Sequence, residues 1–286
     1  MTKPAAKVCI IGWPAKHSRS PLVHNYWLRA FGLEGSYEIA EVAPEDFADF
    51  LRGMAAKDFV GANVTIPHKE RAFELCDFKS ETAQRLRAVN TLWIESGKIH
   101  GDNTDVTGFL AALDAEAPGW DRPLDHAVVL GAGGAARAVL YGLMTRGAAH
   151  IHLVNRSQER AQELARDLGG NLGDSIEVHG WQDVPALLPK ANLLVNTTSL
   201  GMAGQPRLEI DLSALPPHAV VDDIVYVPLE TELLAKARLR GLRTVGGLTM
   251  LLHQAVPGFE KWFGRRPEVT PELRALIEAD VEGRAR

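Results

Sequence analysis

The chain has 286 residues, 46% of them hydrophobic and 23% charged, which supplies enough apolar material for one or two full cores and excludes a disordered protein. Its 31 basic and 36 acidic residues leave a net charge of −5 without any block of like charge, so nothing in it attracts nucleic acid. Only Cys9 and Cys76 are cysteines, and no apolar run is long enough for a signal peptide or a membrane span, so we expect a cytoplasmic protein without a membrane partner.

Along the first hundred residues, short apolar, β-branched runs alternate with segments of helical period, which predicts an α/β fold with a parallel sheet. Pro21 and Pro44 stand where a first helical turn favours proline. The turn at 95–97 predicts a hairpin. We predict strands at 8–11, 37–42, 59–64, 89–94 and 98–102, and helices at 21–31, 44–54 and 80–87.

A second α/β series follows the acidic stretch 114–123. Two such series followed by a helical tail predict two domains separated by a cleft, with the tail able to pack on either one. We predict strands at 127–130, 150–154, 175–179, 193–196 and 220–225, and helices at 135–146, 157–168, 249–263 and 271–281.

A glycine-rich turn directly follows the predicted strand 127–130. It fits the G-x-G-x-x-A pattern of dinucleotide-binding folds, in which Gly131 makes the tight turn, Gly133 lets a pyrophosphate approach and Ala136 allows close helix packing. Gly134 and Ala135 then begin a predicted helix, whose free N–H groups and positive dipole end can bind phosphate. The alternative is a glycine-rich turn of an ordinary βα unit.

The end of the next predicted strand indicates which nucleotide is bound. An acidic residue there would accept a hydrogen bond from a ribose 2′-hydroxyl, but the chain instead has Asn155, Arg156 and Ser157, with Arg160 one turn later. Because arginine binds phosphate in a bidentate fork, we infer NADP(H). In the alternative, Ser157 caps a helix and both arginines are solvated.

Polar residues at three predicted strand ends suggest a catalytic site. Lys69 follows the strand 59–64, Asn90 begins the strand 89–94, and Asp105 comes just after the strand 98–102. A carboxylate near an ammonium group permits proton transfer between groups that tune each other's pKa. The alternatives are that Lys69 is a solvated loop residue and that Asp105 caps a helix at 106–113.

Two further pairs are suggestive. The hydroxyls of Ser18 and Ser20 suit a small carboxylate, although Ser20, before Pro21, could equally be a helix cap. Met250 and Gln254 are four residues apart and share one face of a predicted helix. The ten histidines show no HExxH or similar spacing, so we predict no metal site.

Taken together, nine stretches resemble the shikimate dehydrogenase family, the NADP-dependent shikimate/quinate dehydrogenases of aromatic biosynthesis. They occur in the family's order and run nearly end to end, which makes the resemblance specific. The stretches are 17–25 (HSRSPLVHN), 63–69 (NVTIPHK), 88–91 (AVNT), 101–108 (GDNTDVTG), 131–136 (GAGGAA), 155–157 (NRS), 196–202 (NTTSLGM), 226–228 (YVP) and 247–255 (GLTMLLHQA).

The resemblance implies NADPH-dependent, reversible reduction of 3-dehydroshikimate to shikimate in chorismate and aromatic amino acid biosynthesis. It implies a substrate domain at 1–105, a Rossmann NADP domain at 106–246, and C-terminal helices at 247–286 that return to the substrate domain. Lys69 and Asp105 would be catalytic. The substrate-binding residues would be Ser18, Ser20, Thr65, Asn90, Tyr226 and Gln254. The cofactor-binding residues would be Gly131, Gly133, Gly134, Ala135, Asn155, Arg156, Ser157, Arg160, Thr197, Gly247 and Met250.

Two departures and several alternatives accompany this resemblance. Gly246 stands where an acidic residue is often expected, and Ser157 replaces a usual threonine while keeping its hydroxyl. A quinate or amino-shikimate dehydrogenase is an alternative, and so is a non-catalytic sensor of the nucleotide or a shikimate-like ligand, although Lys69 and Asp105 are both present. Monomer and homodimer both remain open.

Overall fold

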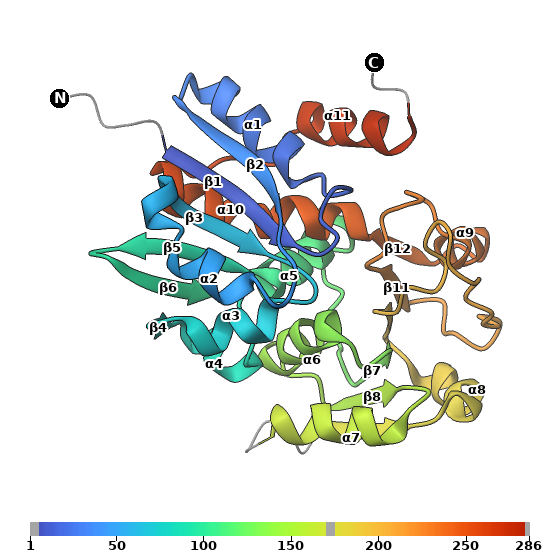
Figure 1. Ribbon diagram of the computed structural model, residues 1–286. Coiled ribbons are helices and arrows are strands. Elements are labelled where there is room, and N and C mark those ends of the chain that lie inside the picture. The colour runs from blue at the N-terminus through green and yellow to red at the C-terminus, as the bar shows by residue number, and fades with distance from the viewer. Residues whose placement is uncertain (1–5, 170–174, 284–286) are drawn as a thin grey trace. The chain divides into compact units, whose positions relative to one another are not determined.

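The computed structural model describes residues 6–169 and 175–283, which form two compact α/β units (Figure 1). Among the described residues, unit 1 contains those up to Thr104 together with Gln254–Ile277, and unit 2 contains those of Asp105–His253 together with those from Glu278 onward. The sequence placed the boundaries after residues 105 and 246, whereas the chain contacts divide it after Thr104 and after His253. No helix in the described ranges is both long and apolar enough to cross a membrane.

Unit 1 is built on a mixed sheet of six strands in the order β2-β1-β3-β5-β6-β4. β1 pairs in parallel with β2 and with β3, whereas β5 runs antiparallel to β3 and β6. Ser96 and Gly97 join β5 to β6 with φ angles of 51° and 72°, the two positive values that a tight hairpin turn requires. The strands are β1 (Ala6–Gly12), β2 (Gly35–Glu41), β3 (Phe59–Val64), β4 (Phe78–Lys79), β5 (Thr91–Glu95) and β6 (Lys98–Asp102).

The helices of unit 1 differ from prediction in two places. The helix predicted at 44–54 begins only at Phe47, and Pro44 lies in the turn before it. The segment after Pro67 forms a helix, where no helix is predicted from the sequence. Ser80 caps the last of these helices by accepting a hydrogen bond from the Ala83 N–H at 3.0 Å. The helices are α1 (Ser20–Phe31), α2 (Phe47–Arg52), α3 (Lys69–Leu75) and α4 (Glu81–Leu86), with a 3-10 turn at Ala55–Lys57.

Unit 2 contains a parallel sheet in the order β12-β11-β10-β7-β8-β9. Numbered in chain order within the unit, this is the 3-2-1-4-5-6 order of the Rossmann fold. The strand order reverses between the parallel neighbours β7 and β10. The predicted Rossmann domain is therefore confirmed as a fold. The strands are β7 (His126–Leu130), β8 (His150–Val154), β9 (Ile176–His179), β10 (Leu193–Asn196), β11 (Val220–Asp223) and β12 (Arg243–Gly246).

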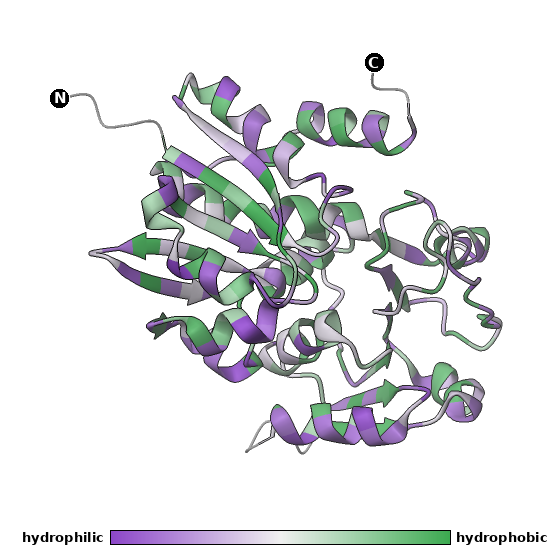
Figure 2. Ribbon diagram, in the orientation of Figure 1, coloured by the Kyte–Doolittle hydropathy of each residue, from purple (hydrophilic) through white to green (hydrophobic). Residues whose placement is uncertain are grey.

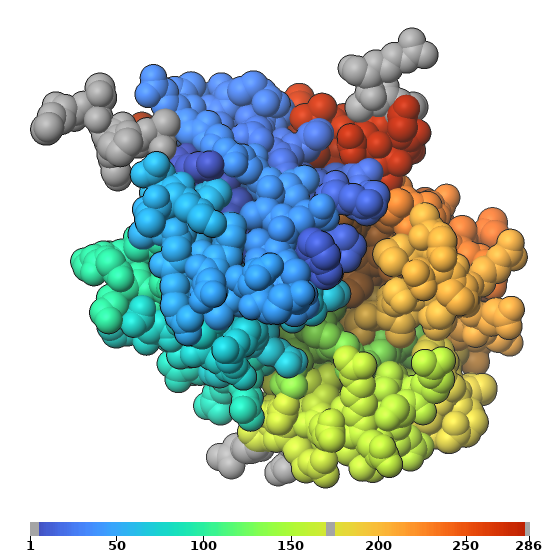
Figure 3. All heavy atoms as spheres, in the orientation of Figure 1, coloured from blue at the N-terminus to red at the C-terminus, as the bar shows by residue number. Residues whose placement is uncertain are grey.

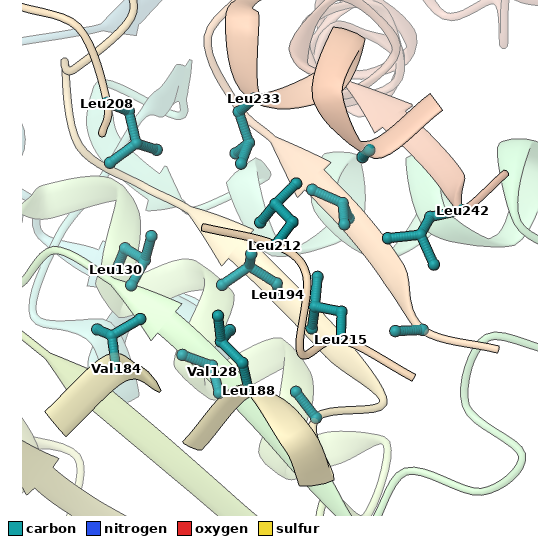
Figure 4. Packing of buried hydrophobic residues seen from close by; sticks show 14 of the residues in the cluster. Val128, Leu130, Val184, Leu188, Leu194, Leu208, Leu212, Leu215, Leu233 and Leu242 are labelled. Atoms are coloured by element: carbon teal, nitrogen blue, oxygen red, sulfur yellow. The ribbon is translucent and has the colours of Figure 1, made fainter. Parts of the chain in front are cut away.

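Apolar side chains hold the unit 2 sheet together. One face carries a cluster in which Val128, Leu130 and Leu194 pack against Val184 and Leu188 (Figure 4). The strands are correspondingly green in Figure 2, whereas α7 is mostly purple because it faces solvent. The helices are α5 (Asp105–Glu116), α6 (Gly134–Thr145), α7 (Gln158–Asp167), α8 (Val184–Leu187) and α9 (Glu232–Leu239), with 3-10 turns at Trp181–Asp183 and Leu188–Lys190.

The C-terminal helices are α10 (Gly247–Phe263) and α11 (Pro271–Val281), close to the predicted bounds. The sequence missed α8, α9 and β12, which are short or lie beside Pro and Gly residues. Gly147 follows α6 and Gly241 follows α9, with φ angles of 78° and 72° that suit the residue after a helix end.

Candidate functional site

The glycine-rich turn of unit 2 lies where β7 passes into α6. Gly131 has a φ of 101°, and a Cβ on it would lie 2.7 Å from Thr198 Cγ2 and 2.9 Å from Thr197 Oγ1. Glycine is therefore needed both for the backbone angle and for space. Thr197 follows β10, and its N–H and Oγ1 each donate a 2.8 Å hydrogen bond to the Leu130 carbonyl. The turn thus sits at the reversal point of the sheet, where such folds bind their ligands.

The space above this turn is open. A Cβ built on Gly133 or Gly134 meets no described atom within 4 Å, and both residues start the twelve-residue helix α6. Ala136 on the same helix is fully buried, as close helix packing requires. Free N–H donors at the N-terminus of α6 and open space over the turn together fit a pyrophosphate.

The end of β8 carries no carboxylate. Ser157 caps α7 by accepting a hydrogen bond from the Arg160 N–H at 3.3 Å, and Asn155 Nδ2 donates to the Ser157 carbonyl at 2.8 Å. Arg156 and Arg160 are exposed and have no ion-pair partner within the part of the chain that the structure describes. The prediction that Ser157 caps a helix is therefore confirmed. The exposed guanidinium groups of Arg156 and Arg160 can bind an anion. Helix α7 forms part of the yellow-green surface in Figure 3.

Unit 1 contains a buried polar network that reaches two of the predicted substrate-binding residues. Asn90 Oδ1 accepts from the Thr104 N–H at 2.8 Å and from Thr91 Oγ1 at 3.0 Å, while its Nδ2 donates to Gln254 Oε1 at 3.3 Å. Thr104 Oγ1 donates to the Gln254 carbonyl at 2.8 Å. Residues 164 positions apart are thereby joined, so Asn90 and Gln254 belong to one site.

A second layer supports this network. Tyr37 donates its hydroxyl to Asn63 Oδ1 at 2.6 Å, and Asn63 Nδ2 donates to the Asn90 carbonyl at 3.1 Å and to Thr91 Oγ1 at 3.2 Å. Because these polar atoms are buried, each missing partner would cost free energy, which holds Asn90 in one orientation. Asn63 and Thr91 lie in the stretches 63–69 and 88–91 that the sequence singled out, but no role was assigned to them there. Tyr37 was predicted only as part of a strand.

Lys69 is the first residue of α3 and is half-buried. Its carbonyl accepts the Val89 N–H at 2.9 Å, while Val64 N–H donates to the Asn90 carbonyl at 2.8 Å. These two bonds hold the 63–69 stretch against the 88–91 stretch. The expectation of a loop at Lys69 is therefore wrong, and the helix start fixes its backbone. Thr65 is held by its N–H, which donates to the Ile11 carbonyl at 2.9 Å.

Ser18 and Ser20 lie at the start of α1. The helix includes Ser20 as its first residue and is preceded by Arg19, so the alternative of Ser20 as the cap is wrong. The Ser18 hydroxyl accepts the Ser20 N–H at 3.2 Å. Ser20 is buried and Ser18 is half-buried, which places both hydroxyls at the helix N-terminus, where a carboxylate is favoured.

The remaining predicted residues lie in unit 2. Asp105 is buried and is the first residue of α5, not the residue before it as predicted for a cap. It follows Thr104 directly in the chain, so its Cα lies about 3.8 Å from that of a member of the unit 1 network. Tyr226 and Met250 are half-buried and Gly247 begins α10. A Cβ on Gly247 would lie 2.1 Å from the Ile224 carbonyl oxygen, so only glycine fits.

The carboxylate of Glu116 lies beside Gly246. Its Oε2 accepts the Gly246 N–H at 3.2 Å and its Oε1 accepts the Thr249 hydroxyl, which places a carboxylate at the N-terminus of α10. A negative charge at that end favours the helix. Glu116 lies 130 positions earlier in the chain, so local sequence reasoning did not connect it with Gly246.

An open pocket of unit 1 borders the buried network, because Thr91 and Thr104 belong to both. It is on the face of the β5–β6 hairpin, and Lys261 stacks over the Trp93 ring there at 4.5 Å. It contains none of the predicted site residues. Its lining consists of Thr91, Trp93, Asp102, Thr104, Pro257, Glu260 and Lys261.

Unit 2 is a Rossmann unit with a glycine turn and no acidic residue at the end of its second strand. The chain also has a separate α/β unit with a network of buried amides. Together these features define a two-domain oxidoreductase that depends on a nicotinamide nucleotide. Three family models match the chain: the shikimate dehydrogenase substrate binding domain at residues 10–92, shikimate / quinate 5-dehydrogenase at 122–206, and the shikimate 5'-dehydrogenase C-terminal domain at 247–276. The chain belongs to the shikimate dehydrogenase family.

Individual relatives agree with this assignment. The shikimate dehydrogenase (NADP(+)) of Rhodopseudomonas palustris is 61% identical over 280 residues, covering 98% of both chains. Shikimate dehydrogenase of Thermus thermophilus in complex with NADP(H) and shikimate is 34% identical with a TM-score of 0.83, covering 96% of this chain and 99% of that one. Quinate dehydrogenase of Corynebacterium glutamicum in complex with NAD is 33% identical with a TM-score of 0.88, covering 95% and 98%.

Proposed function

We propose that the chain catalyses the reversible, NADPH-dependent reduction of 3-dehydroshikimate to shikimate. The observation that carries the proposal is the buried network of unit 1, which orients Asn90 and Gln254 beside the stretch that holds Lys69. An amide-rich, water-poor site of this kind suits a small polyhydroxylated ring. Thr65 and Tyr226 complete the proposed substrate-binding set.

When bound by the residues of unit 2, NADPH would supply the hydride that reduces the C3 carbonyl of the substrate. The oxygen that was the carbonyl oxygen must gain a proton, and Lys69 donates it. Asp105 orients the Lys69 ammonium group and accepts a hydrogen bond from a ring hydroxyl. Ser18 and Ser20 bind the substrate carboxylate. Met250 lines the nicotinamide position.

The residues of unit 2 fit NADP rather than NAD. Gly131, Gly133, Gly134 and Ala135 leave room and N–H donors for the pyrophosphate. Thr197 packs against Gly131, Gly247 packs against the Ile224 carbonyl, and both belong to the proposed cofactor-binding set. Arg156 and Arg160, exposed at the start of α7, hold the 2′-phosphate together with Asn155 and Ser157.

A substrate and cofactor panel tests the proposal. Shikimate and quinate are each offered NADP and NAD, and nicotinamide reduction is followed by absorbance. We expect shikimate with NADP to be the strong combination. The similarity to a quinate dehydrogenase makes quinate the second candidate, and faster reduction of NAD with quinate would replace the first proposal by the second.

Replacing Arg156 by Ala should weaken NADP binding by about 1.5–3 kcal/mol, the value of a charged hydrogen bond, and leave NAD binding nearly unchanged. NAD has no 2′-phosphate to lose. Titration of nucleotide binding by calorimetry measures both affinities. Arg166→Ala, on the same helix α7 and also exposed, is the matched control and should bind both nucleotides like the wild type. Equal weakening of both nucleotides by Arg156→Ala would contradict the assignment.

The double variant Ser18→Ala, Ser20→Ala should raise KM for shikimate more than it lowers kcat, since the hydroxyls bind the carboxylate equally in the ground and transition states. Steady-state kinetics and thermal unfolding are measured together. Ser80→Ala removes a true helix cap of unit 1 and serves as the control: it should lower Tm without changing KM. If the double variant instead unfolds early with an unchanged KM, the two hydroxyls are structural.

We propose further that the enzyme acts in the cytoplasm on a small-molecule substrate and has no nucleic-acid partner. Cys9 and Cys76 are buried free thiols, and burial raises the pKa of each to about 12, which keeps them unreactive. A homodimer is proposed beside the monomer, and light scattering of the purified chain decides between them.

A further inference from the structure

Four histidines and one glutamate gather on one face of the unit 2 sheet. Parallel strands place residues in register on the same face, and His152 pairs in register with Val128 on one side and with Glu177 on the other. This is the face on which Val128 packs against Val184. The cluster adjoins the proposed 2′-phosphate site, because the His179 carbonyl accepts the Asn155 N–H at 3.2 Å. The histidine cluster, as we call it, consists of His126 on β7, His150 and His152 on β8, and Glu177 and His179 on β9.

Three of its ligand atoms form a nearly equilateral triangle. His152 Nδ1 lies 3.1 Å from His179 Nε2 and 3.5 Å from Glu177 Oε2, and His179 Nε2 lies 3.6 Å from the same oxygen. Ligand atoms about 2.0–2.1 Å from a tetrahedral zinc ion are about 3.3 Å apart. The three atoms therefore have the spacing of one face of a zinc coordination tetrahedron.

We propose that His152, Glu177 and His179 bind a divalent transition-metal ion of the zinc type, with water in the fourth position. Two imidazole nitrogens and one carboxylate oxygen are the donor set that zinc prefers when it keeps an exchangeable ligand. The proposed ion takes no part in the dehydrogenase reaction. Its role is to stabilise the pairing of the edge strand β9 with β8.

The two other histidines occupy supporting positions. His126 Nδ1 lies 3.0 Å from His152 Nε2 and can accept its proton, which leaves Nδ1 of His152 to bind the ion. His150 Nδ1 lies 3.2 Å from Glu177 Oε1 and turns the other carboxylate oxygen toward the two ligand rings. Outer hydrogen bonds of this kind fix the orientation of metal ligands in known sites.

The site is accessible to an ion from solvent. The side chain of His152 is 9% exposed, that of His179 22% and that of Glu177 48%. One ligand atom from each of the three residues lies within 4.8 Å of the other two.

The test is calorimetric titration of the tag-free, full-length chain with Zn²⁺ after removal of metal by a chelator. We expect one equivalent per chain, and a Co²⁺ titration should give the visible absorption of a four-coordinate ion. Glu177→Gln, which keeps the side-chain shape, and His179→Gln should each weaken Zn²⁺ binding at least tenfold, as loss of a metal ligand does. His218→Gln, an exposed histidine of the same unit, is the control and should bind like the wild type.

Thermal unfolding supplies an independent measurement. Zn²⁺ should raise the Tm of the wild type in a concentration-dependent manner, because it binds only the folded sheet, and should leave the Tm of Glu177→Gln unchanged. Circular dichroism confirms that each variant is folded. An unchanged stoichiometry and affinity in both ligand variants, or no saturable binding by the wild type, would overturn the proposal.

Discussion

Lys69→Ala should lower kcat for shikimate oxidation by about 10²–10⁴, the loss typical of a missing general acid or base. The substrate and NADP should still bind, since the backbone bond between the Lys69 carbonyl and the Val89 N–H at 2.9 Å does not depend on the side chain. Steady-state kinetics with shikimate and NADP measure the effect, and fluorescence titration measures the affinity for NADPH. The loss should appear in kcat because the proton is transferred only in the reaction.

Lys57→Ala is the matched control for this experiment. Lys57 is an exposed lysine of unit 1 that stacks over the Phe50 ring at 4.7 Å, and its removal should leave kcat within twofold of the wild type, as expected for a surface group. A Lys69→Ala enzyme that keeps most of its activity would remove Lys69 from the mechanism. A loss confined to KM would make it a binding residue.

Acid should destabilise unit 1 through His24. This ring is fully buried and stacks on Tyr37 at 4.2 Å, with Trp27, Phe259 and Trp262 around it. Neither ring nitrogen makes a hydrogen bond of ordinary geometry. Burial lowers the pKa of His24 from 6.5 to about 3, and the nearby Asn63 amide offsets only part of that effect. The folded chain therefore keeps His24 neutral where the unfolded chain protonates it.

The resulting stability is complete above pH 6.5 and is lost as the pH falls toward 3, because the unfolded state binds the extra proton in that window. The slope is about 1.4 kcal/mol per pH unit, so the total effect is on the order of 5 kcal/mol. Urea unfolding of the wild type and of His24→Phe, followed by tryptophan fluorescence from pH 4 to 8, measures it. The free energy of unfolding of the wild type minus that of His24→Phe should increase with pH up to 6.5 and then stay constant.

The difference is the proper quantity because other groups act in the opposite direction. Burial raises the pKa of Asp222 well above its usual value and also raises that of Asp223. Because these carboxyls ionise more readily in the unfolded chain, they lower the free energy of unfolding as the pH rises. Their effect is the same in both chains and cancels. His218→Phe, at an exposed histidine, should retain the wild-type pH dependence. A difference independent of pH would show that His24 does not titrate as its burial requires.

The sequence by itself determined most elements with strong local patterns. The bounds of β3, β8, β10 and α11 are the predicted ones, and the glycine turn at Gly131 was readable from its place between strand and helix. Such features depend on neighbours within a few residues, so their signal is local. The short helix α3 was missed for the same reason: seven residues after a proline carry too little periodicity to be recognised.

Only the tertiary structure decided which distant side chains meet. It joined Asn90 to Gln254, supplied the Gly246 N–H with a carboxylate from Glu116, and assembled His152 with Glu177 and His179. HExxH is a helical spacing and gives no signal for the histidine cluster. In that cluster, H-x-H and E-x-H stand on adjacent strands, where every second residue shares a face. Register between strands is set by packing over the whole sheet, and no local pattern in the chain specifies which strands become neighbours.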